Sequence, residues 1–274
     1  MSHQNDVEIL AHDLLSAYET GQPVTSLPSS RPEFSLDTAY EVEAALKRFR
    51  EAGGAKAVGR KVGYANKAMW RVFKLQTLVW AHMYDNTVQY SDGNSATLTP
   101  AHPHALKIEP EIVFGLKQPI TAEGVNATAA LESTEWLAMG FEIIDCPFPD
   151  WKFQPSDFVA YFGLHAALVI GERVPVRPDA IPKLLEELPR FKVRVSKHGE
   201  FVEEGSGKNC LTSPALCLAE LSTAILRRFP NEPLRAGEIV SSGTLTAGHQ
   251  TNRGDSWTVE VEGLSLPPLT LHLG

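Results

Sequence analysis

From about residue 56 onward, the chain is a succession of short segments rich in strand-forming residues, and this pattern limits the fold more than any other feature. The segments read AVGRKVGY, EIVFGL, MGFEIID, ALVIG, FKVRVS, GEIVSSGTLT, WTVEV and LTLHL. Glycine, proline, asparagine or aspartate separates many of them, as is typical of strands joined by turns. We therefore predict an α+β protein with a mostly antiparallel β-rich domain over residues 56–274.

The first 55 residues follow a different pattern. Apolar residues recur at helical spacing from Asp6 to Glu19 and again after Ser35. Ser35 is a suitable N-cap, and Gly53 and Gly54 favour the end of the second helix. Residues 1–55 are therefore predicted to be an N-terminal helical segment packed on the β-rich domain. Helices inside that domain are predicted at about 127–139, 178–188 and 213–228.

The composition argues against several classes of partner. A chain of 274 residues with 43% hydrophobic residues can bury a substantial core, and its net charge of -8 without a dense Lys/Arg run argues against nucleic acid. No apolar stretch approaches the roughly 20 residues that span a bilayer, and the N-terminus lacks a signal-peptide pattern. We expect a cytoplasmic protein without a membrane partner. The three cysteines form no C-x-x-C pair and are expected to be buried thiols.

Two Glu-x-Glu pairs occur in strand-like segments, and they are predicted to differ in role. Glu260 and Glu262 alternate with apolar residues in WTVEV, which is typical of a strand with one dry and one solvated face. Glu109 and Glu111 stand in KIEPEIVFGL, directly before an apolar run. Since side chains two residues apart on a strand point to the same face, these two carboxylates point together on a face that is only half solvated.

A third carboxylate strengthens the case for a site. Glu142 stands in MGFEIID, whose apolar residues indicate a largely buried strand, and a buried carboxylate must be neutralised, paired or bound to a cation. Three carboxylates on neighbouring strands can bind one hard divalent cation such as Mg²⁺, with positions left for substrate oxygens. The alternative is that Glu142 forms a core salt bridge with Arg60 or Lys61.

Other polar residues are weaker candidates. Lys61 has Gly59 and Gly63 as its same-face neighbours, so nothing bulky flanks an amine that is suited to binding an anion or moving a proton. His165 is a possible acid or base, although a lone strand histidine is more often structural. The same holds for His82 and His249, and Asp85 precedes an asparagine as in an ordinary turn. The GSGKN stretch lacks P-loop spacing and is predicted to be a hairpin or flap whose Lys208 contacts substrate.

Several motifs together resemble the fumarylacetoacetate hydrolase superfamily, and within it the branch of 2-keto-4-pentenoate hydratases and 4-oxalocrotonate decarboxylases. The matching stretches are SLDTAYEVEAAL, GRKVGYANKAM, KIEPEIVFGL, GFEIID and LRAGEIVSSGTLT, spread over most of the chain. The resemblance implies mixed sheets rolled into a sandwich-like barrel with helices at the N-terminus. It also implies Mg²⁺ or Mn²⁺ bound by Glu109, Glu111 and Glu142, with Lys61 and Asp85 as the groups that shuttle protons.

Two segments depart from the pattern of this branch. One is GKNCLTSP, which stands where relatives tend to have an A-V-L-G-H-P-like stretch, and the other lies at residues 159–168. Where related hydratases have a polar D-N-x-S-like stretch, this chain has VAYFGLHAAL. Tyr161, Phe162 and Leu164 are therefore expected to line the part of the site that receives the substrate's tail. If the stretch is a strand, only one parity faces the site: Phe162 and Leu164 favour an apolar tail, whereas Tyr161 and His165 favour a second carboxylate.

The resemblance implies an enzyme for a small 2-keto or 2-hydroxydienoic acid in catabolism, most simply a hydratase that adds water across a C=C bond. A decarboxylase of an oxalocrotonate-like keto diacid and a C–C hydrolase of acylpyruvates are the alternatives within this class. A different class is a catalytically silent metal-binding scaffold, but a degenerate site would normally lack a ligand or the lysine. Relatives imply a homo-oligomer.

Overall fold

Two β-sheets form the centre of the fold in this computed structural model, which describes residues 3–101 and 103–274. The larger sheet has the order β2-β1-β11-β5-β6-β7-β3, with β12 beside β5 and β8 beside β6, and the smaller has the order β10-β9-β13-β14-β4. The strands of the larger sheet are β1 (Ala57–Gly63), β2 (Val79–Tyr84), β3 (Val88–Tyr90), β5 (Leu106–Leu116), β6 (Thr134–Asp145), β7 (His165–Ile170), β8 (Val174–Pro175), β11 (Ile239–Thr244) and β12 (His249–Gln250). The smaller sheet has β4 (Ser95–Leu98), β9 (Lys192–Lys197), β10 (Glu200–Ser206), β13 (Ser256–Glu262) and β14 (Leu269–Leu273).

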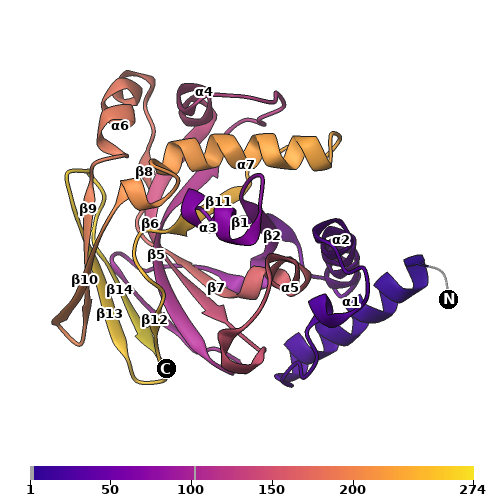
Figure 1. The fold of residues 1–274 in the computed structure, drawn as a ribbon. Coiled ribbons are helices and arrows are strands. Elements are labelled where there is room, and N and C mark those ends of the chain that lie inside the picture. Colours follow the sequence, from indigo (N-terminus) through magenta and orange to yellow (C-terminus); the bar gives the residue numbers. More distant parts are fainter. Residues whose placement is uncertain (1–2, 102) are drawn as a thin grey trace.

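Most strand pairs are antiparallel, as predicted, but three are parallel. Strand β1 pairs with β11, β3 with β7, and β14 with β4 in the parallel sense. Figure 1 shows the smaller sheet at one side of the molecule and the N-terminal helices at the other, with the curled larger sheet between them. The expected α+β fold of mixed, rolled sheets with N-terminal helices is confirmed.

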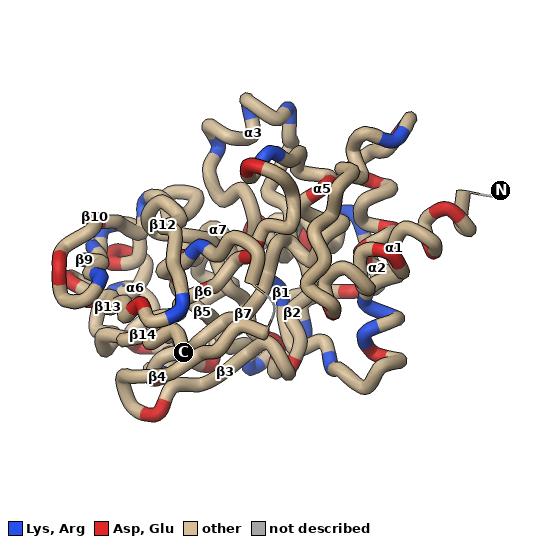
Figure 2. The backbone as a smooth tube through the Cα atoms, turned by 90° about the horizontal axis from the view of Figure 1, so that it is seen from below, with Lys and Arg blue, Asp and Glu red and all other residues tan. Residues whose placement is uncertain are grey.

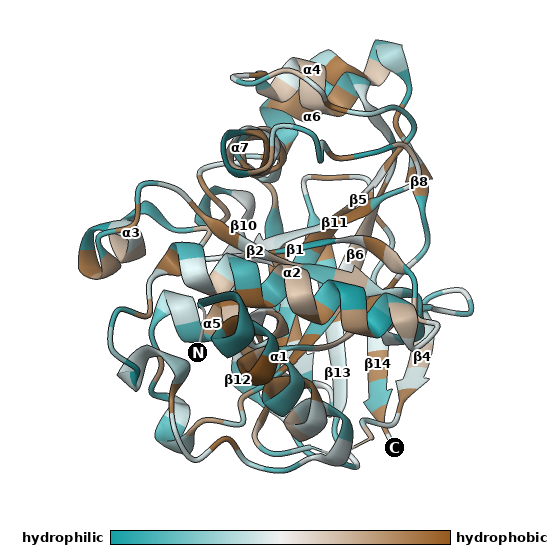
Figure 3. Cartoon of the chain, turned by 90° about the vertical axis from the view of Figure 1, so that its right-hand side faces the viewer, coloured by the Kyte–Doolittle hydropathy of each residue, from teal (hydrophilic) through white to brown (hydrophobic). Residues whose placement is uncertain are grey.

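The N-terminal segment consists of helices α1 (His3–Thr20) and α2 (Leu36–Ala52). The Ser35 side chain accepts a hydrogen bond from the backbone N–H of Thr38, and Gly53 follows the last turn of α2, so both helix-end predictions are correct. Figure 3 shows hydrophobic and hydrophilic residues alternating along these helices. Their buried faces belong to the same hydrophobic core as the sheet residues, and the segment therefore packs directly on the β-rich domain.

Five further helices follow: α3 (Lys67–Phe73), α4 (Ala127–Glu132), α5 (Pro155–Ala160), α6 (Ile181–Glu187) and α7 (Pro214–Arg228). The segment Gly207–Arg228, which contains α7, is long and apolar enough to cross a membrane, but 78% of its apolar 18-residue stretch is buried inside the protein, as in a core helix. Acidic and basic residues are interspersed along the elements seen in Figure 2. All three cysteines are free and buried, as expected.

The helix predicted at 127–139 is wrong in its second half. Helix α4 ends at Glu132, and from Thr134 the chain becomes β6, which pairs along its length with β5. Trp136 and Met139 are buried in that strand. Tertiary pairing has overridden a local pattern that was compatible with a helix.

Candidate metal centre and pocket

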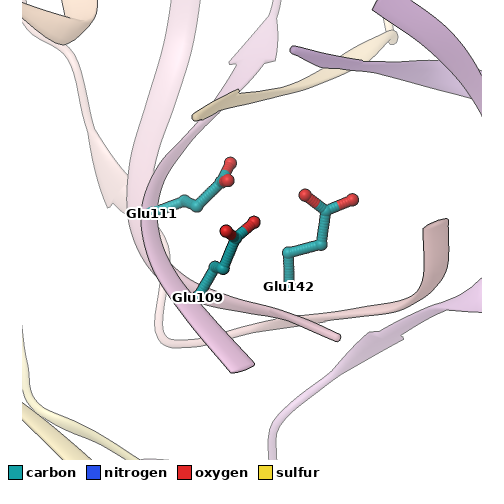
Figure 4. A group of neighbouring side chains, drawn as sticks. All are labelled: Glu109, Glu111 and Glu142. Atoms are coloured by element: carbon teal, nitrogen blue, oxygen red, sulfur yellow. The ribbon is translucent and has the colours of Figure 1, made fainter. Parts of the chain in front are cut away.

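The centre of the site is the antiparallel pair β5 and β6. Glu109 and Glu111 project from β5 to one face, and the strand register places Glu109 directly opposite Glu142 on β6. One ligand oxygen from each of the three carboxylates lies within 4.8 Å of the others, and Figure 4 shows the three groups pointing toward one another. Oxygens bound to one Mg²⁺ at about 2.1 Å lie at most about 4.2 Å apart, so small side-chain movements would bring them into coordination.

A bulge in β11 supports Glu111. The register of β11 against β5 shifts between Ser241 and Thr244, opposite Glu111. Gly243 has a φ of 100°, which glycine adopts without strain. The bulge directs the Gly243 N–H and the Ser241 hydroxyl at the carboxylate: Oε2 of Glu111 accepts hydrogen bonds from both, at 2.8 and 2.5 Å. Its Oε1 is buried without a hydrogen-bond partner among the described residues and is therefore available to a cation.

The three carboxylates differ in electrostatic environment. Burial raises the pKa of Glu109 to about 7, and neighbouring Glu142 acts in the same direction. Burial and the charges of Glu142 and Glu109 together raise the pKa of Glu111 well above its usual range. Burial also acts to raise the pKa of Glu142, but Lys61 and His165 outweigh it and lower that pKa. Without a cation, negative charge is therefore concentrated on Glu142.

Lys61 comes from β1 and is almost completely buried, with 2% of its surface exposed. Its Nζ donates a hydrogen bond to the Gly163 carbonyl at 2.9 Å and lies 3.1 Å from Oε2 of Glu142. The amine also lies over the Phe158 ring, 4.7 Å from its centroid. The two explanations of Glu142 considered from sequence are thus combined: it belongs to the carboxylate cluster and forms an ion pair with Lys61.

The glycines beside Lys61 make room for neighbouring protein atoms and not for a ligand. A Cβ on Gly59 would lie 1.9 Å from the Ile239 carbonyl oxygen on β11. A Cβ on Gly63 would lie 2.4 Å from the Phe158 ring, which also contacts the Lys61 amine. The glycines allow close approach of β11 and of Phe158, so they position the lysine indirectly.

His165 holds the other side of Glu142. Its Nδ1 is hydrogen-bonded to Oε1 of Glu142 at 2.8 Å, and its Nε2 to the Thr87 hydroxyl at 3.0 Å. The ring is buried and faces a neighbouring cavity of about 300 Å³, rather than the pocket that contains Lys61. This geometry gives His165 the position of a group that orients a ligand carboxylate.

A pocket of about 600 Å³ opens at the carboxylate cluster. Lys61, Glu109 and Lys107 line it, together with the β11 bulge at Gly243 and Thr244. Its apolar walls come from separate segments: Met69, Phe73, Ile144, Trp151, Phe153, Phe158 and Leu164. Polar, charged groups at one end and aromatic walls around it are typical of a small-ligand site.

Several residues proposed from sequence do not meet at this pocket. Asp85 lies on an exposed turn after β2, where Oδ1 accepts hydrogen bonds from the backbone N–H groups of Lys56 and Asn86. Its expected proton-shuttling role is therefore corrected to that of a turn cap, the ordinary function of Asp-Asn. Lys208 is exposed on a 3-10 turn, and its neighbour Asn209 lines the pocket instead.

The Tyr161–His165 stretch is also corrected, because it is not a strand. Phe162, Gly163 and Leu164 form a 3-10 turn with φ values of 51°, 61° and 58°, and β7 begins only at His165. The argument from strand parity consequently does not apply. Leu164 lines the pocket, whereas Tyr161 lines the neighbouring cavity and Phe162 packs on Tyr18, 4.5 Å between ring centroids.

The remaining sequence candidates have structural partners. His82 is buried and hydrogen-bonded through Nδ1 to Glu43 on α2. His249 pairs with Glu203 at 2.7 Å. Glu260 and Glu262 are exposed on β13, so the solvated strand face predicted for them is confirmed.

Three features of the pocket were missed from sequence. Lys107 stands two residues before Glu109 on the same strand face, and Trp151 and Phe158 line the same pocket although they lie more than 40 residues further along the chain. The i, i+2 spacing on β5 could have identified Lys107. The aromatic residues carry no such signal, because their approach depends on turns that the sequence pattern did not reveal.

The donor set fits a hard divalent cation. All three ligands are carboxylates, one of them has a buried oxygen without a partner among the described residues, and the pocket leaves room for substrate oxygens. Such a site on curled mixed sheets defines a class of protein that holds a divalent cation beside a small-molecule pocket.

Within that class, the chain belongs to the fumarylacetoacetate hydrolase family: residues 58–268 match the family described as Fumarylacetoacetate (FAA) hydrolase C-terminal. It is 29% identical over 264 residues to a 2-hydroxyhexa-2,4-dienoate hydratase of Comamonas testosteroni, covering 96% of this chain and 97% of that protein. It is 27% identical over 261 residues to a 4-oxalocrotonate decarboxylase of Pseudomonas sp. (strain CF600), covering 95% of each.

A solved structure agrees over the whole chain. The 4-oxalocrotonate decarboxylase from Pseudomonas putida G7, complexed with magnesium and adipate, superposes with a TM-score of 0.87 at 25% identity, covering 100% of this chain and 99% of the other. A fumarylpyruvate hydrolase from Pseudomonas aeruginosa, in complex with Mn²⁺ and pyruvate, gives a TM-score of 0.58 at 16% identity over 79% of this chain and 88% of the other, a likeness of fold alone.

Proposed function

We propose that this protein is a divalent-metal-dependent lyase that adds water to a C=C bond of a small 2-hydroxydienoic or 2-keto-enoic acid. The observation that carries the proposal is the meeting of Glu109, Glu111 and Glu142 with the buried amine of Lys61 at the end of one pocket. Relatives named as hydratases that align over nearly the whole chain support it, and so does the magnesium-bound structural neighbour.

The three glutamates would hold Mg²⁺ or Mn²⁺. A divalent cation bound there supplies Lewis-acid polarisation of the carboxylate and 2-oxo oxygens of a keto acid. The protein's own groups orient the substrate: the β11 bulge fixes Glu111, and Lys61 and His165 fix Glu142 from two sides. Preorganised charges of this kind favour the negative charge that develops on the substrate as protons move.

Lys61 is the group best placed to move a proton. Lys61 lines the pocket, only 2% of its surface is exposed, and its Nζ lies 3.1 Å from Oε2 of Glu142 in the carboxylate cluster. In hydration of a 2-hydroxydienoic acid, the proton of the 2-hydroxyl moves to the end of the carbon chain, which leaves a 2-keto acid with one C=C bond. Water then adds its hydroxyl to one carbon of that bond and its remaining proton to the other. An amine held beside the substrate's head can take part in both transfers.

Decarboxylation of a keto diacid is the second candidate. The specific observation in its favour is a second cation, Lys107, in a pocket that already contains Lys61. Relatives named as 4-oxalocrotonate decarboxylases align over the same length as the hydratases. Both reactions place negative charge on the keto-acid head, so the same carboxylate cluster would serve either.

The experiment separates the reactions by product. Purified protein with Mg²⁺ is supplied with 2-hydroxypenta-2,4-dienoate, 2-oxohex-3-enedioate or an acylpyruvate, and loss of conjugated absorbance and release of CO₂ are followed separately. Hydration of the dienoate, abolished by chelation, is the expected result. Dominant CO₂ release from the diacid would move the proposal to decarboxylation, and cleavage of the acylpyruvate alone would move it to C–C hydrolysis. Tight metal binding without turnover would leave only the scaffold explanation.

We also propose that the protein acts in the cytoplasm and that it forms the homo-oligomer that the family resemblance implies. Light scattering on the purified chain after size exclusion tests the assembly. A single species with the 30.0 kDa mass of one chain would contradict it.

A further inference from the structure

We propose that Glu203 is the base that takes a proton from the water molecule that adds to the substrate, and that His249 positions it. The inference rests on the proposed function, because it assigns a residue to the water-adding stage of hydration. The family resemblance implied two proton-shuttling groups, Lys61 and Asp85, but Asp85 lies on an exposed turn and does not line the pocket. The structure therefore leaves one of the two proton-transfer roles without a residue.

Few side chains of the pocket can accept a proton from water. Five titratable residues line it: Lys61, Tyr64, Lys107, Glu109 and Glu203. Lys61 is paired with a glutamate of the cluster, and the Nζ of Lys107 lies over the Trp151 ring, 3.9 Å from its centroid. Burial raises the pKa of Tyr64, which keeps its phenol protonated, and Glu109 belongs to the carboxylate cluster. Among the described residues of the pocket wall, Glu203 is the carboxylate that remains.

Glu203 reaches the pocket from the smaller sheet. It lies on β10, and among the described lining residues it alone belongs to that sheet, whereas Lys61 and Glu109 come from the larger one. The loop at 245–248 lies between Glu203 and the cluster. Glu203 accepts a hydrogen bond from the backbone N–H of Ala247, and a Cβ on the next residue, Gly248, would lie 2.9 Å from Oε1 of Glu109. Glu203 therefore lies beside the cation-binding cluster without belonging to it.

The Glu203 carboxylate is held through one oxygen. Its Oε2 is hydrogen-bonded to Nε2 of His249 at 2.7 Å and to the backbone N–H of Ala247 at 3.1 Å. Within residues 3–101 and 103–274, Oε1 has no hydrogen-bond or ion-pair partner. The side chain is 36% exposed, so water can reach it. A carboxylate fixed on one side and open on the other is suited to accept a proton from a bound water molecule.

His249 is itself held in place. Its ring stacks on the indole of Trp257, with 5.7 Å between ring centroids and an interplanar angle of 25°. Trp257 is 1% exposed, and its Nε1 donates a hydrogen bond to the Thr251 hydroxyl at 2.8 Å. The short strand β12, which carries His249, pairs with β5, the strand of Glu109. The imidazole is thus fixed relative to the cluster, and it orients a carboxylate that comes from the other sheet.

The proposed step adds one water molecule and needs no other reactant. Ketonisation of 2-hydroxypenta-2,4-dienoate leaves 2-oxopent-3-enoate, whose C3=C4 bond is conjugated with the 2-oxo group. The Glu203 carboxylate takes a proton from water as the water oxygen bonds to C4, and the electron pair of the C=C bond moves toward the 2-oxo oxygen to form an enolate. The protonated Glu203 carboxyl then returns the proton to C3. This restores the carboxylate and gives 4-hydroxy-2-oxopentanoate.

The test separates the two stages of hydration. Native protein and variants are given 2-hydroxypenta-2,4-dienoate with Mg²⁺, and proton NMR follows the dienoate, 2-oxopent-3-enoate and 4-hydroxy-2-oxopentanoate. Glu203→Gln can accept the same hydrogen bonds but cannot take a proton. It should consume the dienoate within about threefold of the native rate, whereas hydration should fall at least about 10²-fold and 2-oxopent-3-enoate should accumulate. Lys61→Met should instead slow the loss of the dienoate.

Three further variants serve as controls. Glu204→Gln changes the next residue on β10, which is exposed and paired with Lys192 at 2.9 Å, and should leave both stages unchanged. His249→Phe keeps a ring on Trp257 but removes the hydrogen bond to Glu203, and should slow hydration by about 10-fold. If Glu203→Gln fails to fold, Glu203→Ala takes its place. Added formate should then restore part of the hydration, and failure to do so would count against the inference.

The alternative is that Glu203 only braces the loop at 245–248 beside Glu109. In that case Glu203→Gln would hydrate at the native rate, or would slow both stages equally and weaken Mg²⁺ binding in a calorimetric titration. Either result would overturn the inference, while hydration by the native protein would still support the proposed function. If the native protein does not hydrate the dienoate, the proposed function fails, and this inference fails with it.

Discussion

Glu111 and Glu142 are both fully buried, yet their surroundings shift their pKa values in opposite directions. Burial and two neighbouring carboxylates raise the pKa of Glu111, whereas Lys61 and His165 outweigh burial at Glu142 and lower its pKa. The difference comes from partners and not from depth, because both side chains have 0% exposure. Glu142 is consequently the carboxylate most prepared to bind a cation in its charged form.

The first prediction concerns this residue. Glu142→Gln keeps the shape but removes one charged ligand, so Mg²⁺ affinity should fall by about 10-fold or more in a calorimetric titration. Glu260→Gln on the exposed face of β13 is the matched control and should bind as the native protein does. Unchanged affinity in Glu142→Gln, Glu109→Gln and Glu111→Gln would mean that the cluster holds no cation.

The second prediction concerns Lys61. Lys61→Met should lower turnover by at least about 10²-fold, the usual scale for a positioned acid or base. In excess Mg²⁺, its melting temperature should stay within a few degrees of the native value, because the cation compensates Glu142 when the ammonium is gone. Near-normal turnover, or failure to fold in Mg²⁺, would contradict this role. Lys183→Met, which removes an exposed lysine of α6, controls for loss of a charge.

For individual residues, the sequence indicated which side chains could bind a cation or move a proton, but it was less informative about where they lie in the fold. Glu109, Glu111 and Glu142 could be found because strand spacing and apolar neighbours mark a carboxylate as buried. Asp85 could not be judged correctly, since Asp-Asn has the same pattern in a turn cap as near a catalytic centre. Lys107 has the right spacing, but nothing in the sequence shows that Trp151 will meet it.

Among the elements, the parallel pair of β1 and β11 determines where Lys61 lies. The strands approach so closely at Gly59 that a methyl group there would meet the backbone of Ile239 and not a movable side chain. The third prediction follows: Gly59→Ala should lower the free energy of unfolding by about 1–3 kcal/mol or more, measured by urea titration. Gly53→Ala, where the nearest atom would be 3.4 Å away, should change it little. A stable Gly59→Ala variant would show that β1 and β11 can separate without cost.

Elements with a strong periodic pattern were predicted well, and elements defined by contacts were not. The two N-terminal helices have an apolar stripe and clear end signals, and both occur where expected. The region after Glu132 was predicted to be helical because its residue pattern is compatible with both a helix and a strand. Its pairing with β5 makes it a strand. The turn at Phe162–Leu164 requires positive φ at two non-glycine residues, which sequence preferences disfavour.

For the whole molecule, cation binding and folding should be linked. Glu109 and Glu142 face each other directly across two strands, and like charges in that position destabilise a sheet. The fourth prediction is that Mg²⁺ at about 100 times its dissociation constant stabilises the protein by about 2.7 kcal/mol, a rise in melting temperature of roughly 5–10 °C. Thermal unfolding in EDTA and in Mg²⁺ measures the difference, which should largely disappear in Glu142→Gln. An equal melting temperature in both buffers would contradict the linkage.

The overall architecture could be predicted only in part from the chain's own pattern. Strand content and N-terminal helices follow from local periodicity, whereas the order of the strands does not. In the larger sheet, β11 lies between β1 and β5 although more than a hundred residues separate it from either. Such long-range pairing leaves no local trace, and the family resemblance supplied the rolled sheets that periodicity could not.

The pocket draws its two ends from different parts of the chain. The glutamates come from the paired strands β5 and β6, whereas most of the aromatic wall comes from residues 151–158, a turn and a short helix outside that pair. Substitutions at Trp151 and Phe153 can therefore change which acid fits while the chemistry of the head stays intact, whereas Phe158 also contacts the Lys61 amine. Evolution can therefore change substrate preference through the turn at residues 151–153. A mutant library confined to that turn would likewise leave the cation-binding glutamates unchanged.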